Sequence, residues 1–93
     1  MNASNEVPEE DVDAALLAYE EGRALLVEGV LALKDLENKV TAQIQEREDA
    51  EAPKSVVHPL RSAHAALIAA RKELVMAEQR TASRLRSLHR QQV

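Results

Sequence analysis

The sequence contains no cysteine, tryptophan or phenylalanine, and its only aromatic residue is Tyr19. Without cysteine the chain forms no disulfide and offers no thiolate to a metal. Its 93 residues must build a core from Ala, Leu and Val, which is marginal for so short a chain. No apolar run approaches the length of a membrane span, and residues 1–13 lack the segments of a signal peptide. We therefore expect a cytoplasmic protein that associates with a second copy or another protein.

Proline is rare, and its three positions divide the chain. Pro8 is followed by acidic residues, a pattern typical of a helix start, and the next proline is Pro53. The sequence therefore predicts a flexible tail over 1–8, a helix over about 9–49, a loop over about 50–55 and a second helix over about 56–90. Either Ser55 or His58 is expected to cap the second helix.

The two predicted helices carry opposite charge. Residues 1–52 hold 14 acidic and 4 basic side chains, whereas residues 53–93 hold 2 acidic and 8 basic ones. A short loop between long helices predicts an antiparallel hairpin, in which facing residues have numbers that sum to roughly 104. Leu16 and Tyr19 should then lie near Leu85 and Leu88, with the acidic helix beside the basic one.

Small residues recur every seven positions in both helices. A heptad repeat of this kind predicts core positions where two helices pack. In the second helix the series is Ala63, Ala70 and Ala77, each followed four positions later by Leu67, Leu74 and Thr81. In the first helix it is Ala15, Gly22, Gly29 and Leu36, flanked by Ala18, Leu25 and Ala32. Both glycines of the chain belong to this series, and we interpret them as sites of close helix packing rather than as a hinge.

The apolar arc of the first helix spans roughly 200°, about twice the stripe that one neighbouring helix covers. Small residues occupy one flank of this arc. The other flank is formed by Leu16, Tyr19, Leu26, Val30 and Leu33. The sequence therefore predicts two packing surfaces, one for the chain's own second helix and one for a neighbour. We expect a homodimeric four-helix bundle or coiled coil, with a different protein as the alternative partner. The pattern leaves open whether the hairpin closes or two chains exchange helices.

Few residues suggest chemistry. His58, His64 and His89 are not paired with ligands at helical spacing, and the sequence has no glycine-rich phosphate loop or nucleophile triad. We therefore expect no metal, no cofactor and no enzymatic activity.

One stretch nevertheless suggests an enzyme. The run from Asp13 to Leu17, followed by Arg23, Val30 and Lys34, resembles the first helix of the all-helical chorismate mutases. This resemblance covers about 22 residues and implies that Arg23 and Lys34 bind substrate carboxylates. The chain departs from that family at Glu6, where a further arginine is expected, and it does not show the family's order of three helices.

The end of the second helix is basic. Four arginines gather there, Arg80, Arg84, Arg86 and Arg90. They suit the negative end of the helix dipole and the acidic first helix, and they are also candidates for contacts with a charged partner or with nucleic acid. The sequence thus predicts a small protein-interaction module, such as an adaptor, inhibitor, chaperone or assembly component. A nucleic-acid-binding hairpin is the alternative, and a mutase-like enzyme is the remote one.

Overall fold

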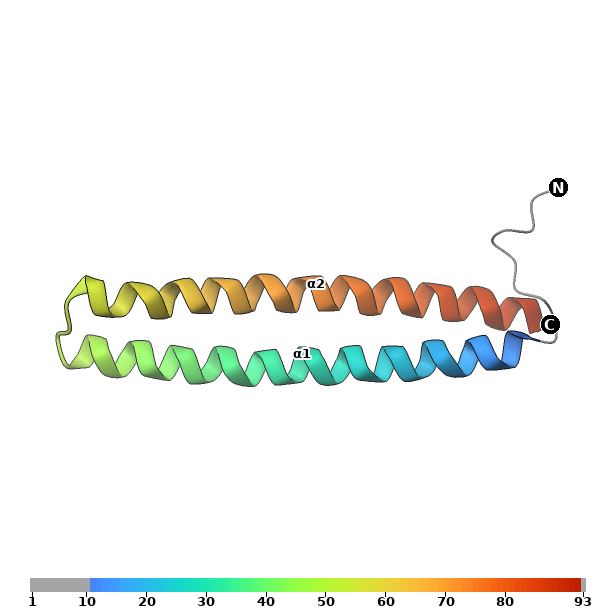
Figure 1. Ribbon diagram of the computed structural model, residues 1–93, viewed down its shortest axis with the longest axis horizontal. Coiled ribbons are helices and arrows are strands. Elements are labelled where there is room, and N and C mark those ends of the chain that lie inside the picture. The colour runs from blue at the N-terminus through green and yellow to red at the C-terminus, as the bar shows by residue number, and fades with distance from the viewer. Residues whose placement is uncertain (1–10, 93) are drawn as a thin grey trace.

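The computed structural model describes residues 11–92, which form two long antiparallel helices joined by a short loop (Figure 1). α1 spans Val12–Asp49 and α2 spans Lys54–Gln92, and no strand occurs among the described residues. The all-α helical hairpin predicted from the sequence is confirmed. The predicted tail over 1–8 and the first two residues of the predicted first helix lie outside the described residues.

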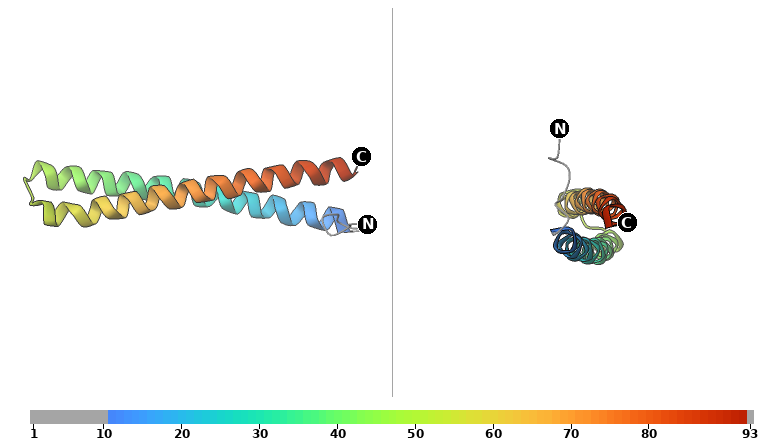
Figure 2. Two further views of the ribbon diagram at one scale, coloured as in Figure 1. Left: turned by 90° about the horizontal axis from the view of Figure 1, so that it is seen from above. Right: turned by 90° about the vertical axis from the view of Figure 1, so that its right-hand side faces the viewer.

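The hairpin is long and only one helix thick. Its principal extents are 65 × 23 × 14 Å. Seen from above, the two ribbons cross near the middle of the molecule, and seen from the end they form a single layer (Figure 2). Stable domains are normally built from at least two packed layers. A one-layer hairpin leaves both of its broad faces without a second layer.

The loop begins with a cap that normally uses glycine. Glu51 has a φ of 57°, which lies in the left-handed region. Its N–H donates to the Glu48 carbonyl at 3.0 Å, and the Ala52 N–H donates to the Arg47 carbonyl at 2.9 Å. This is the Schellman pattern, which ends a helix by satisfying its last carbonyl groups. The chain therefore turns sharply just before Pro53.

The start of α2 differs from both predicted caps. The helix begins at Lys54, so neither Ser55 nor His58 lies at its N-cap. The carbonyl of Pro53 accepts the N–H groups of Val56 and Val57, at 2.9 and 3.3 Å. Pro59 lies inside the helix rather than at its start. The predictions were wrong because Pro53 both ends the loop and opens the helix.

The two helices meet along positions that alternate by three and four residues. We call these positions the hairpin seam. In α1 they are Val12, Leu16, Tyr19, Arg23, Leu26, Val30, Leu33, Glu37, Val40, Ile44 and Arg47. In α2 they are Val57, Leu60, His64, Leu67, Arg71, Leu74, Glu78, Thr81, Leu85 and Leu88. Apart from Arg23 and Tyr19, each of these residues is buried or half-buried.

Neither predicted series of small residues is the seam of this hairpin. In α1 the seam lies one position after Ala15, Gly22, Gly29 and Leu36. Ala63 and Ala70 are exposed and Ala77 is half-buried, so the seam of α2 lies one position further along, at His64, Arg71 and Glu78. The leucines predicted beside the alanines, Leu67 and Leu74, do face α1 as half-buried seam residues. The heptad spacing alone does not separate these two sets of positions, and the charged residues occupy the seam because Arg71 and Glu78 pair with α1 across it.

The densest part of the core lies near the helix ends opposite the loop. Val12 and Leu16 of α1 cluster there with Leu85 and Leu88 of α2, and Ala15 packs against them. This confirms that Leu16 lies near Leu85 and Leu88. Tyr19, predicted beside them, keeps 38% of its surface exposed. Elsewhere the seam contains fewer fully buried side chains, because a single pair of helices encloses little volume.

Candidate interaction surface

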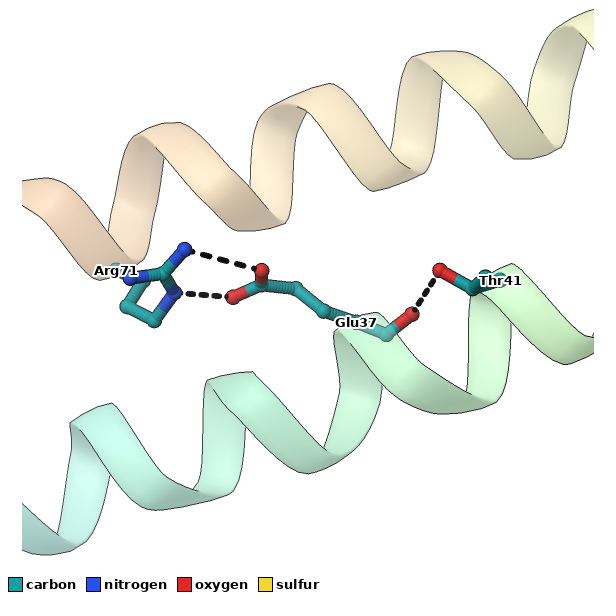
Figure 3. A network of polar contacts seen from close by, with 3 residues as sticks. All are labelled: Glu37, Thr41 and Arg71. Atoms are coloured by element: carbon teal, nitrogen blue, oxygen red, sulfur yellow. Dashed lines mark hydrogen bonds and ion pairs between the residues drawn. The ribbon is translucent and has the colours of Figure 1, made fainter.

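A charged pair lies inside the hairpin seam at mid-length. The Arg71 Nε donates to Glu37 Oε2 at 2.6 Å, and its Nη2 donates to Oε1 at 3.3 Å (Figure 3). The Glu37 residue is only 9% exposed. Its backbone carbonyl also accepts the Thr41 hydroxyl at 2.9 Å. The two-pronged contact orients both side chains and ties the middle of α1 to one place on α2.

This contact changes the acidity of the carboxyl group. The hydrogen bond from Arg71 lowers the pKa of Glu37 below the ordinary value of a glutamate, and burial opposes this effect without reversing it. A lowered pKa in the folded state means that the pair stabilises the hairpin above the ordinary pKa of glutamate. That stabilisation is lost as the pH falls through the lowered value.

A second pair of seam residues has the opposite polarity. Here the base is on α1, and Arg23 Nε donates to Glu78 Oε2 at 2.7 Å. The Arg23 side chain is 49% exposed and that of Glu78 is 21% exposed. Near the loop, Arg61 of α2 also pairs with Glu48 of α1. Sliding the helices by one heptad separates these partners, so the charges favour a single register.

The small-residue flank of α1 remains open. We call it the outer stripe, and its positions again alternate by three and four residues: Ala15, Ala18, Gly22, Leu25, Gly29, Ala32 and Leu36. None of them is charged. Leu25 is 66% exposed and Leu36 is 43% exposed. The outer stripe therefore has the spacing of a helix-packing surface, and its two leucines stay exposed within the described residues.

The two glycines of the outer stripe have different surroundings. A Cβ atom added to Gly29 lies 2.9 Å from Leu74 Cδ1, whereas one added to Gly22 meets nothing within 4 Å. Gly29 thus permits a close approach of the Leu74 side chain within the hairpin. Nothing inside the hairpin requires the glycine at position 22.

Replacing each glycine with alanine should separate these two roles. In the dilute single chain, Gly22→Ala is expected to raise the free energy of unfolding by about 0.5–1 kcal/mol, because alanine favours the helix. Gly29→Ala gains the same propensity but must displace Leu74, so its net gain is smaller or negative. Urea denaturation of both variants measures the difference. Equal gains would show that the contact with Leu74 imposes no restriction.

The small residues of α2 lie on the same broad face as the outer stripe. On the opposite face, an open groove is lined by residues of both helices that include Glu20, Val27, Ala82 and His89. In an antiparallel pair, the residues that precede the seam positions of α1 lie on the same face as the residues that precede the seam positions of α2. These preceding residues include the outer stripe in α1 and Ala63, Ala70 and Ala77 in α2. We call this shared surface the small-residue face.

The predicted interface residues therefore divide between two surfaces. The bulky ones, Leu16, Leu26, Val30 and Leu33, lie in the hairpin seam, and Tyr19 lies at its edge. The small ones lie on the small-residue face. At the basic end of α2, Arg80, Arg86 and Arg90 are exposed and Arg84 is half-buried. The structure does not bring these arginines into one enclosed site.

Sequence reasoning missed the charged residues of the seam. A signal was present, since Glu37 follows Leu33 by four positions and precedes Val40 by three. Arg71 lies in the same way between Leu67 and Leu74. Charged residues at core positions of both helices indicate an internal pair when the hairpin register brings them together.

The described part of the chain offers little that suggests other kinds of site. Among residues 11–92 no group of three His, Cys, Asp or Glu residues is placed to hold a metal ion. Neither α1 nor α2 has a stretch that is long and apolar enough to cross a membrane.

Comparisons with protein-family models, with curated proteins and with solved structures find no match to this chain.

Proposed function

We propose that this chain is a small protein-interaction module that acts through its small-residue face and forms a homodimeric four-helix bundle of the coiled-coil type. The observation that carries this proposal is the outer stripe. It is an uncharged, heptad-spaced surface with two exposed leucines, on a hairpin only 14 Å thick. A second hairpin packed on that face supplies the missing layer.

The free energy gained by burying the leucines of the outer stripe favours association. Full burial of a leucine side chain contributes about 1.5–3 kcal/mol. A symmetric dimer buries Leu25 and Leu36 twice, once from each chain. The glycines and alanines between them allow helix axes to approach to the lower end of the usual 8–10 Å range. Such a surface suits another helix better than a small polar ligand, since the residues that define it are all apolar.

Nucleic-acid binding is the second candidate, because α2 carries eight basic and two acidic side chains. Against it, the acidic α1 lies alongside, and no aromatic residue of α2 can stack on a base. Filter retention of RNA and DNA at low salt separates the two proposals. Retention that weakens steeply with salt favours nucleic acid, whereas no retention removes this candidate.

We propose that the chain is not an enzyme. The resemblance to helical chorismate mutases assigns substrate carboxylates to Arg23 and Lys34. The guanidinium of Arg23 is instead engaged by Glu78 within the chain. An assay of mutase activity checks this directly, and activity that is lost in Arg23→Ala would overturn it.

Two matched leucine variants test the proposed interaction surface. Leu25 lies on the small-residue face and is 66% exposed, whereas Leu31 lies on the opposite side of α1 and is 61% exposed. Leu25→Glu is expected to convert the dimer to a monomer in light scattering at tens of micromolar, because each interface would bury a carboxylate. Leu31→Glu adds the same charge to the same helix and should leave the mass unchanged. A monomeric wild-type chain, or equal loss in both variants, would contradict the proposal.

A further inference from the structure

We propose that the occupant of the small-residue face is a second copy whose α2 lies on α1, with the loops of both hairpins at the same end. This inference rests on the proposed function and specifies its geometry. Two symmetric arrangements bring small-residue faces together. In the first, the two-fold axis runs along the hairpin and α1 meets the partner's α2. In the second, the axis is perpendicular to the helices, α1 meets the partner's α1, and the loops lie at opposite ends.

The charges of the helices favour the first arrangement. α1 carries nine acidic and four basic side chains, whereas α2 carries two acidic and eight basic ones. Placing α1 on the partner's α1 brings two acidic helices together and also two basic ones. Placing α1 on the partner's α2 sets a net acidic helix against a net basic one at both contacts, so the summed electrostatic term is attractive, although Glu73 adds one acidic side chain beside Ala70 and Ala77.

The residues bordering the outer stripe lead to the same choice. Glu21, Glu28 and Asp35 each follow a stripe residue by three positions and line its outer edge. In the arrangement with loops at opposite ends, centred at mid-length of α1 near Ala32, Glu28 lies beside the partner's Asp35 twice over. With the loops together, the same edge of α1 lies beside α2 of the partner near Arg80, which is exposed in the single chain.

The register of the first arrangement is fixed by the hairpin itself. A two-fold axis along the hairpin keeps every residue at its own height. Gly29 contacts Leu74 within the chain, so it lies level with residues 74–77 of α2. The partner's Ala77 then lies opposite Gly29, and the partner's Ala70 lies opposite Leu36. A small residue therefore lies opposite either another small residue or a leucine. The two chains can pack closely without sliding along each other.

Distances between spin labels distinguish the arrangements, because the natural chain has no cysteine that could take up a label. Lys54→Cys and His89→Cys place single labels near the two ends of α2, at exposed positions away from the small-residue face. With helix layers about 10 Å apart, both variants should give intermolecular distances within about 30 Å. Light scattering of each labelled variant controls for the dimer mass.

Every other outcome overturns the inference in a recognisable way. Long distances in both variants, comparable with the 65 Å length of the molecule, would show that the loops lie at opposite ends. A short distance between the labels at position 54, together with a distance far beyond 65 Å between the labels at position 89, would show that the two chains exchange helices. In both cases the chain is still a dimer, so the proposed function stands while this geometry fails. Absence of any intermolecular distance at the monomer mass contradicts the proposed homodimer itself.

Discussion

Leu88→Ala is expected to lower the free energy of unfolding by about 2–5 kcal/mol, the range for large-to-small changes in a packed core. Leu88 has no exposed surface and lies in the cluster with Val12, Leu16 and Leu85. The lost methyl groups leave a cavity that two straight helices cannot easily close. Because small domains are stable by only about 5–15 kcal/mol, the variant should unfold at much lower urea concentration.

Leu17→Ala is the matched control for this prediction. Leu17 lies on α1 beside the same cluster, but 60% of its surface is exposed. Its replacement should change the unfolding free energy by well under 1 kcal/mol in the single chain. If both variants lost the same stability, the cluster near the helix ends would not be the main part of the core.

Arg71→Glu is expected to destabilise the hairpin strongly, because it places two carboxylates against each other at a core position. Glu37 is 9% exposed and loses the guanidinium that satisfies both of its oxygens. The added change Glu37→Arg restores an opposite pair with its direction reversed, so the double variant should recover most of the loss. Thermal unfolding of the two single variants and the double variant gives the coupling between the positions.

The pair near the loop is the control for this charge reversal. The side chains of Arg61 and Glu48 are 57% and 42% exposed. Exposed pairs contribute about 0.2–1 kcal/mol, so Arg61→Glu should have an effect several times smaller than that of Arg71→Glu. Failure of Glu37→Arg to rescue Arg71→Glu would indicate that the pair does not contribute through its direct contact.

The hairpin could be predicted from the sequence because its signals are local. Prolines mark the break near residue 53, and the short loop between long helices predicts an antiparallel pair. The opposite charges of the halves favour contact between them. The apolar arc of α1 is twice as wide as one contact needs, which predicted two packing surfaces without saying which one α2 covers; the structure leaves Leu25 and Leu36 exposed in the single chain.

The seam of α2 could not be placed by the same reasoning. Hydrophobicity alone predicts Ala63, Ala70 and Ala77 as the seam positions of α2. It disfavours the polar residues that follow them, which are His64, Arg71 and Glu78. A charged residue becomes favourable at a core position only when a partner on the other helix meets it, and Glu37 provides that partner for Arg71. This information lies in the tertiary register rather than in either helix alone.

The glycines show the same limit. They share a stripe and a spacing of seven, so nothing in the sequence distinguishes one glycine from the other. The structure shows that Gly29 faces Leu74 and that Gly22 faces open space. The difference depends on where the side chains of α2 lie along α1, which is set by the seam and its charged pairs.

Small-angle X-ray scattering of the wild-type chain distinguishes the proposed face-to-face dimer from a monomer and from an end-to-end dimer, because it measures mass and length together. We expect a particle of twice the 10.3 kDa chain mass whose length stays close to the 65 Å of one hairpin, since the second copy adds a layer on one face. A 10.3 kDa particle would show that the small-residue face stays uncovered. A particle of twice that mass and nearly twice the length would show that the chains associate end to end.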